Sequence, residues 1–556
     1  MRSYLVSLTT LGLVGALFGA AVGLSEWSPL WPRLSLLLVV RGIALGWLVG
    51  AVLSPVIGRL LARRARGSHD RPRSRWRRAA RGALVLAGIA PALLWLAAIA
   101  PNGVIRKAVP GGRWPGDARP NVVLITIDAL RADHVGVYGE VAGLTPNIDA
   151  FAAEATRYDA AYAPSPWTLP SFGSIFTAVP PSECGLKTAL VELTDWYIWE
   201  AKLADGPPVV AELLRRAGYT TAAVITNPFL AAERGFGRGF EHFRNEDGSE
   251  LGSLFTRADA VTENALSWLG MNRHRPFFLW LHYMEPHVPY NSPETPPELR
   301  AQYPRQWLTR RLHWYGEMRH ADDETKTRYQ EFCRVMYREE VRYADKWVGR
   351  LLDELRKAGM YEDSLVVITS DHGEELFDHG EFEHGHAMHE EVLWVPLLVK
   401  WPTGWAADER VMQTVGLTEL APTFLEVAGV STSGMSGKPL PRREGDGGAE
   451  VYSEGMFYGS EQTALTTDGY KLIYRPHEEP GALRFEVYDR RRDRDERQDL
   501  GGTGVAAGLR EGLVKRTEAA QEAAERWKPR GEKEFEVIDL SAQSKRRLRA
   551  LGYLAD

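Results

Sequence analysis

Short apolar runs alternate with amphipathic segments between residues 120 and 449. The apolar runs, which are rich in β-branched residues and end in polar clusters, are Asn121–Ile127, Thr220–Ile225, Phe277–His282, Ser364–Thr369 and Val395–Lys400. The segments with apolar residues at helical spacing are Asn147–Ala155, Val209–Ala217, Ala258–Leu269 and Thr327–Lys357. Buried strands that alternate with helices are typical of parallel sheets. The pattern predicts an α/β domain over 120–449, with a mainly parallel sheet sandwiched by helices.

The pattern changes after about Glu450, where shorter runs replace the buried ones. Gln462–Pro476, with a turn at Asp468-Gly469, and Phe485–Asp489 indicate short antiparallel strands. We therefore expect a small antiparallel C-terminal subdomain over 450–502. A helical tail is expected over 503–556, with its main helix at Val505–Trp527.

Three long apolar segments precede the α/β domain. They cover residues 4–24, 36–57 and 83–100, and each is long enough to cross the hydrocarbon core of a membrane. A cleaved signal peptide is the alternative for the first, and the second contains Arg41, which would have to reach toward the membrane surface. We expect a membrane region over 1–101 with three transmembrane helices, and a linker over 102–119.

The charge of the chain is unevenly distributed. Residues 1–81 hold 13 arginines and two acidic residues, a net charge of +11, whereas the remainder holds 54 basic and 70 acidic residues, a net charge of −16. Ten of the arginines lie between Arg59 and Arg81, between the second and third apolar segments. The positive-inside rule places this loop in the cytoplasm and everything after Pro101 outside. We expect a multi-pass protein of a bacterial inner or plasma membrane, in contact with the lipid bilayer, whose acidic catalytic domain is extracytoplasmic and binds no nucleic acid.

Polar side chains that suit a metal follow two of the predicted strands. Asp371 and His372 come directly after Ser364–Thr369, and Asp128 directly follows Asn121–Ile127. Ligands gather at the carboxyl ends of parallel strands, and carboxylate with imidazole suits a divalent metal. The alternative is that Asp371 caps a helix that begins near Gly373.

A second segment, from Pro164 to Ser171, leads into a predicted helix. Pro170 suits the first turn, and Thr168 is expected just ahead of it, beside backbone N–H groups that favour an anionic ester. Close to a metal, this hydroxyl could ionise and act as a nucleophile. The alternative is that Thr168 only caps the helix.

Several motifs together resemble the sulfatase family of the alkaline-phosphatase-like superfamily. They are the run from Asn121 through Asp128 and Arg131 to His134, the segment Glu285-Pro286-His287, the segment Asp371-His372-Gly373-Glu374, and the segment Leu417–Thr423. The resemblance implies an alkaline-phosphatase-like fold and a metal-dependent enzyme that acts on sulfate or phosphate esters.

The chain departs from the formylglycine type of that family. The nucleophile motif of that type, Cys or Ser-x-Pro-x-Arg, corresponds to Thr168–Phe172, so no formylglycine is expected. The second aspartate of the family's pair is Ala129, and its Gly-Lys-x-His element corresponds to 225–228, without lysine or histidine. The threonine resembles phosphoethanolamine and phosphoglycerol transferases, whose first ligand is usually Glu rather than Asp128.

The resemblance implies a set of site residues. Asp128, Thr168, Asp371 and His372 are the expected ligands of one divalent ion; Zn²⁺ or Mn²⁺ is favoured, and Ca²⁺ or Mg²⁺ stays open. Thr168, His287 and His384 are the expected catalytic residues, and Asn227 and His386 the expected contacts of the substrate. For His386, a second-metal ligand or a support role stays open.

The function expected from these residues is a metal-dependent hydrolase or transferase that works through Thr168. Its substrate would be an anionic phosphate (or sulfate) ester of an envelope lipid headgroup, glycan or other polymer. One alternative is a sulfuric ester hydrolase without formylglycine. The other is a catalytically degenerate relative that binds an anionic ligand.

Overall fold

The computed structural model describes residues 119–527, apart from 140–142, 187–201, 246–256, 273–274, 310–317, 447–449, 458 and 477–482. The three predicted membrane helices, all but the last residue of the predicted linker, and residues 528–556 of the predicted tail lie outside the described residues. Within the described part, none of the helices combines the length and the apolar character that crossing a bilayer requires.

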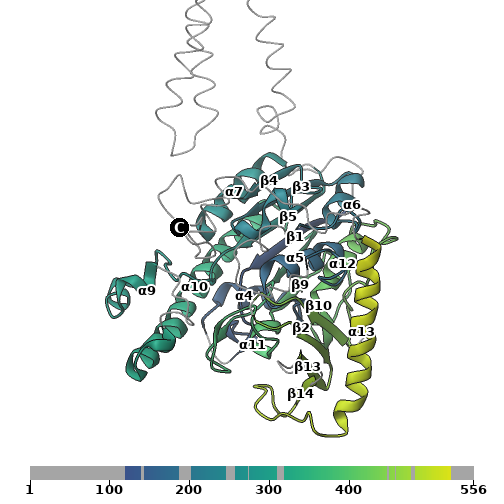
Figure 1. Ribbon diagram of the computed structural model, residues 1–556. Helices are drawn as coiled ribbons and strands as arrows, with labels where there is room; N and C mark the ends of the chain where they lie inside the picture. Colours follow the sequence, from purple (N-terminus) through teal and green to yellow (C-terminus); the bar gives the residue numbers. More distant parts are fainter. Residues whose placement is uncertain are drawn as a thin grey trace, which may run out of the picture. The chain divides into compact units, whose positions relative to one another are not determined.

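An eight-stranded sheet forms the centre of the α/β part, in the order β10-β2-β9-β6-β1-β5-β3-β4 (Figure 1). Its strands are β1 Asn121–Ile127, β2 Thr156–Tyr162, β3 Thr220–Ile225, β4 His242–Asn245, β5 Phe277–Tyr283, β6 Ser364–Thr369, β9 Leu397–Lys400 and β10 Arg410–Gly416. Neighbouring strands pair in parallel except β9, which runs antiparallel to β6 and β2. The predicted α/β class with a mainly parallel sheet is therefore confirmed.

Helices cover both faces of this sheet. The longer ones are α4 Pro146–Ala152, α5 Thr168–Thr177, α6 Val210–Arg216, α7 Ala258–Asn272, α10 Asp323–Lys357 and α12 Leu420–Val427. Val122 and Leu124 of β1 belong to the apolar core formed with α5, α6 and α12, whereas Val123 and Ile125 belong to the core formed with α4, α7 and α10. Because successive strand residues point to opposite faces, the sheet is sandwiched by two helical layers, as predicted.

Short helices connect these elements. They are α8 Pro297–Arg300, α9 Arg305–Thr309 and α11 Glu390–Leu393, together with the 3-10 turns η3 Ala132–His134, η5 Pro228–Leu230, η6 Ala232–Arg234, η8 Met318–His320 and η9 Leu417–Glu419.

A second, antiparallel sheet follows the first in the chain. Its strands, in spatial and sequence order, are β11 Glu450–Glu454, β12 Thr463–Thr467, β13 Tyr470–Pro476 and β14 Leu483–Asp489. The helix α13, Val505–Trp527, packs Ala506 and Leu513 against Leu465, Leu472 and Val487 of this sheet. The predicted antiparallel C-terminal part is thus present, and α13 has the predicted bounds.

Three strands of the large sheet were not expected from the sequence: β2, β4 and β10. β4 has four residues, and none of them is fully buried. β2 carries Arg157 and Asp159 at partly exposed positions, and β10 at the edge of the sheet exposes Arg410 and Met412. A half-exposed strand lacks the continuous apolar run by which the central strands were recognised.

A buried lysine joins the two sheets. Lys471 of β13 is fully buried, and its Nζ lies 3.0 Å from Glu390 of α11 and 2.9 Å from Glu496. Burial alone would raise the pKa of Glu496, but Lys471 and His389 lower it to about 2. The C-terminal sheet is therefore held to the α/β part by an ion pair whose charged groups are buried.

Replacing Lys471 with methionine should lower the free energy of unfolding by about 3–5 kcal/mol, because two buried carboxylates would lose their cation. Lys346→Met is the matched control: Lys346 pairs with Glu294, whose side chain is 47% exposed, and its loss should cost less than about 1 kcal/mol. Denaturant unfolding followed by circular dichroism measures both variants. Equal losses would contradict a structural role for the buried lysine.

Candidate metal centre

Two adjacent parallel strands bring the candidate ligands together. β1 and β6 pair so that Thr126 lies opposite Thr369, and Asp128 and Asp371 follow two residues later on each strand. Both carboxylates therefore leave the same edge of the sheet from neighbouring positions.

The cluster is compact and fully buried. His372 Nε2 lies 3.5 Å from Asp128 Oδ1, 3.5 Å from Asp371 Oδ2 and 3.2 Å from Thr168 Oγ1. Asp128, Asp371 and His372 offer ligand atoms that all lie within 4.8 Å of one another. Among the described residues, no donor bonds Asp128 Oδ1 or Asp371 Oδ2. Two buried carboxylate oxygens without a donor, facing one imidazole nitrogen, fit a divalent cation.

The electrostatics of the cluster also favour a cation. Burial and the neighbouring Asp128 carboxylate raise the pKa of Asp371 above its ordinary value. Burial would likewise raise the pKa of Asp128, but the imidazoles of His287, His282 and His372 outweigh it and lower that pKa. Two carboxylates this close together do not readily ionise at the same time, because their negative charges repel each other. A bound cation offsets this repulsion.

The loop after β6 fixes the tautomer of His372. His372 Nδ1 lies 2.8 Å from the Gly373 carbonyl, which can only accept, so Nδ1 carries a proton and Nε2 is the nitrogen that faces the carboxylates and is free to bind a cation. Gly373 N donates to Val392 O, and a Cβ at Gly373 would lie 2.0 Å from the Glu391 carbonyl oxygen. The chain continues into strand β7, Glu375–Leu376, so the alternative that Asp371 caps a helix is wrong.

Thr168 is the first residue of α5, with its side chain buried. Trp167 occupies the cap position without a side-chain hydrogen bond, so the alternative that Thr168 caps the helix is wrong, and so is its expected place just ahead of the helix. Its Oγ1 lies 3.2 Å from His372 Nε2 and 3.4 Å from Asn227 Nδ2. The hydroxyl therefore faces the carboxylate and imidazole cluster.

Asn227 follows β3 and is held in one orientation. Its Oδ1 accepts from the Phe229 N–H at 2.9 Å, so Nδ2 is the group that donates to Asp128 Oδ2 at 2.6 Å and approaches Thr168. Asn227 thus presents a donor beside the hydroxyl.

His384 and His287 lie beside the cluster. Strand β7 and strand β8, Phe382–Glu383, form a hairpin whose end carries His384. Glu374 Oε1 lies 2.9 Å from His384 Nδ1, and the His384 ring centroid is 4.3 Å from that of His372 and 5.0 Å from that of His287. Two of the expected catalytic histidines therefore lie at one side of the carboxylates.

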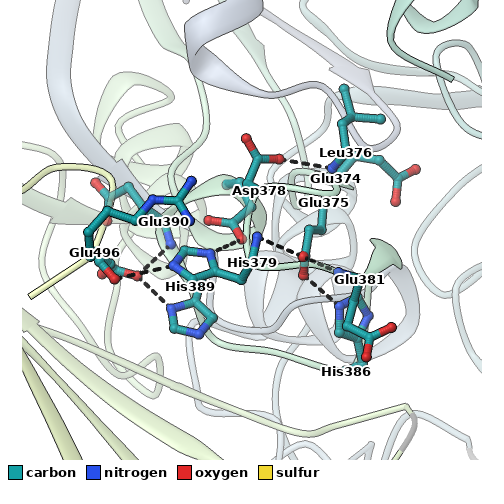
Figure 2. A network of polar contacts seen from close by, with 12 residues as sticks. Glu374, Glu375, Leu376, Asp378, His379, Glu381, His386, His389, Glu390 and Glu496 are labelled. Atoms are coloured by element: carbon teal, nitrogen blue, oxygen red, sulfur yellow. Dashed lines mark hydrogen bonds and ion pairs between the residues drawn. The ribbon is translucent and has the colours of Figure 1, made fainter. Parts of the chain in front are cut away.

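His386 has a different partner. Its Nε2 lies 2.8 Å from Glu375 Oε2, and Glu375 Oε1 accepts from the backbone N–H groups of His379 and Glu381 (Figure 2). This contact favours the support role among those left open for His386, because it fixes the end of the hairpin that carries His384.

Sequence reasoning gave no role to two buried residues of the site. Glu374 was visible in its motif, but its contact with His384 spans ten residues of the chain and a hairpin that the sequence did not predict. His282 lies inside β5, where it looked like part of a buried strand; its Nε2 lies 3.2 Å from Asp128 Oδ2. Its place as the last residue of the predicted strand, one residue before the end of β5, was the one available signal.

Known protein families and curated proteins are similar to this chain in sequence. The family model Sulfatase matches residues 120–430, and the model N-sulphoglucosamine sulphohydrolase, C-terminal, matches residues 377–523. The chain is 25% identical to the N-acetylglucosamine-6-O-sulfatase of Bacteroides thetaiotaomicron, over 72% of this chain and 86% of the relative. It is also 25% identical to Arylsulfatase K of Canis lupus familiaris, over 63% and 72%.

Solved structures share the fold. BT4656, solved with its substrate D-glucosamine-2-N,6-O-disulfate, has a TM-score of 0.56 at 20% identity and covers 75% of this chain and 100% of its own. The phosphonate monoester hydrolase of Agrobacterium radiobacter has a TM-score of 0.58 at 17% identity, over 73% and 96%. Since the Sulfatase model spans more than half of the sequence, the chain belongs to the sulfatase family.

Proposed function

We propose that the chain is a metal-dependent hydrolase of sulfate esters, with a sulfated glycan as the substrate class. The observation that carries the proposal is the convergence of Thr168, Asp128, Asp371 and His372 in one buried cluster. Similarity to an N-acetylglucosamine-6-O-sulfatase supports the sulfate ester over the phosphate ester favoured by sequence analysis.

The charge of the site is an argument against a phosphate monoester as the substrate. Phe172 and Asn227 stand where the formylglycine type has an arginine and a lysine-containing element. A sulfate monoester carries one negative charge, whereas a phosphate monoester carries nearly two at neutral pH. A site with fewer cationic side chains therefore suits a singly charged ester, such as a sulfate monoester, better than a phosphate monoester.

Asp128, Asp371, His372 and Thr168 would hold the cation, which when bound supplies positive charge to the ester oxygens and favours the ionised form of the hydroxyl. Asn227 Nδ2 is placed to donate to a non-bridging oxygen. Ionised Thr168 Oγ1 forms a bond to sulfur, the bond from sulfur to the alcohol oxygen breaks, and His384 protonates that oxygen. Water then attacks sulfur and passes a proton back to His384, which releases sulfate and regenerates Thr168.

A singly charged phosphodiester or phosphonate monoester is the second candidate substrate. Thr168 favours it, because threonine is not converted to formylglycine in this family, and phosphoryl-transferring relatives use a threonine at this place. An acceptor hydroxyl instead of water in the second step would make the enzyme a transferase.

A panel of p-nitrophenyl sulfate, p-nitrophenyl phosphate and bis-p-nitrophenyl phosphate, with Mn²⁺ or Zn²⁺, tests the proposal. The sulfate should be turned over fastest, Thr168→Ala should lose at least about 10³-fold in kcat, and Thr168→Ser should retain part of it. Faster turnover of the diester would favour the second candidate. Absence of turnover with all three would favour the degenerate, ligand-binding alternative.

Asp371→Asn should abolish tight binding of the cation, because the amide cannot supply the negative charge of the ligand. Asp378→Asn is the matched control, since Asp378 lies seven residues further along, in the turn between β7 and β8, and pairs with Arg131 at 2.6 Å. Elemental analysis and titration calorimetry of the metal-free protein measure the effect. Unchanged metal content in Asp371→Asn would exclude this centre.

We also propose that the catalytic part is extracytoplasmic and tethered to a membrane by the segments 4–24, 36–57 and 83–100, which lie outside the described residues. The ten-arginine loop supports this orientation, since moving each charge outward costs about 2.3 kcal/mol per 100 mV. An alkaline phosphatase reporter fused after Asp556 should be active, and a green fluorescent reporter exported by the general pathway should be dark. The reverse pattern would overturn the topology.

A further inference from the structure

His282 connects the candidate metal centre to the core of the sheet. It lies on β5, is fully buried, and pairs in register with Thr126 of β1, two residues before Asp128. Its Nε2 lies 3.2 Å from Asp128 Oδ2, and its Nδ1 lies 2.9 Å from Thr126 Oγ1. Both ring nitrogens therefore have defined partners.

The partners of Thr126 determine which nitrogen of His282 donates. The indole Nε1 of Trp280, which can only donate, lies 3.0 Å from Thr126 Oγ1. The single hydroxyl proton of Thr126 then goes either to the Leu281 carbonyl, at 3.0 Å, or to His282 Nδ1. If the proton goes to the Leu281 carbonyl, Nδ1 of His282 must itself donate to Thr126. An unprotonated Nε2 would then turn its lone pair toward the carboxylate of Asp128, which is unfavourable. In this case the ring therefore carries both protons. In the second case the neutral ring carries its proton on Nε2.

Both arrangements place an N–H of His282 against Asp128. The same oxygen, Asp128 Oδ2, also accepts from Asn227 Nδ2 at 2.6 Å, so two donors converge on it. The other oxygen, Oδ1, has no donor among the described residues and faces His372 Nε2 at 3.5 Å. The two donors thus select which carboxylate oxygen is presented to the cluster.

The ring of His282 is also held by apolar packing. Phe172 lies edge-to-face against it with ring centroids 4.9 Å apart, and the Trp280 ring lies at 6.2 Å. Phe172 occupies the position of the arginine of the formylglycine motif, so an apolar ring packs against the imidazole of His282 at this place.

We propose that His282, oriented by Thr126 and Trp280, is a positioning residue that fixes Asp128 with Oδ1 toward the cation. The inference rests on the metal centre of the proposed function. In this proposal His282, a residue of strand β5, sets the metal affinity, because hydrogen bonds to a ligand carboxylate determine the orientation and basicity of that carboxylate.

The test compares His282→Leu with His282→Gln in the metal-free protein, by titration calorimetry with Mn²⁺ and Zn²⁺. Removing the donor should raise the dissociation constant about 10–100-fold, the range seen for such outer contacts. His282→Gln, whose amide nitrogen can donate near the place of Nε2, should recover most of the affinity. Thr126→Val should weaken binding in the same direction, because it removes the group that orients the ring.

Thr262→Val is the matched control for Thr126→Val. Thr262 is also buried, and its Oγ1 bonds the hydroxyl of Tyr283 at 2.8 Å, away from the carboxylates. Thr262→Val should leave metal binding unchanged. The comparison separates the loss of any buried hydroxyl from the loss of the hydroxyl that orients the His282 ring.

Wild-type affinity in both His282→Leu and Thr126→Val would overturn the role of His282 while leaving the metal centre intact. If His282→Leu does not fold, Thr126→Val against Thr262→Val decides. No metal binding by the wild-type protein would instead overturn the centre, and this inference with it.

Discussion

The structure of the candidate site depends on two carboxylates that are forced together without water. The parallel pairing of β1 with β6 fixes Asp128 and Asp371 at neighbouring strand ends. The repulsion between the two carboxylates is strongest when both are ionised and buried, so positive charge added between them would stabilise the cluster. His372, Thr168 and Asn227 surround the two carboxylates, and each comes from a different strand end or helix start. Loops then hold the remaining histidines close by.

The central strands could be predicted because burial on both faces leaves a continuous apolar run. Asn121–Ile127, Thr220–Ile225 and Ser364–Thr369 have the bounds expected from the sequence, and the residues after them meet as expected. β2, β4 and β10 were missed because each is partly exposed. The antiparallel direction of β9 was also missed, since a short buried run carries no sign of its direction.

The site was predictable where strand ends supply the residues, and less so where contacts cross a loop. Asp128, Asp371, His372 and Asn227 meet because the sheet topology brings them there. The pairing of Glu374 with His384 depends on a hairpin of two-residue strands, which is too short to leave a periodic pattern. His282 was hidden because one histidine in an apolar strand is usually a packing residue.

The buried lysine between the two sheets has a consequence for how the enzyme loses its structure. If the C-terminal sheet separated, Glu390 would lose Lys471, His389 would lose Glu496, and the loop that carries His384 would lose the hydrogen bond from Phe457 N to Gly385 O. Partial opening therefore breaks buried ion pairs, which is costly. We expect the two sheets to unfold together, because the C-terminal region helps to hold the loop that carries His384 beside the candidate metal centre.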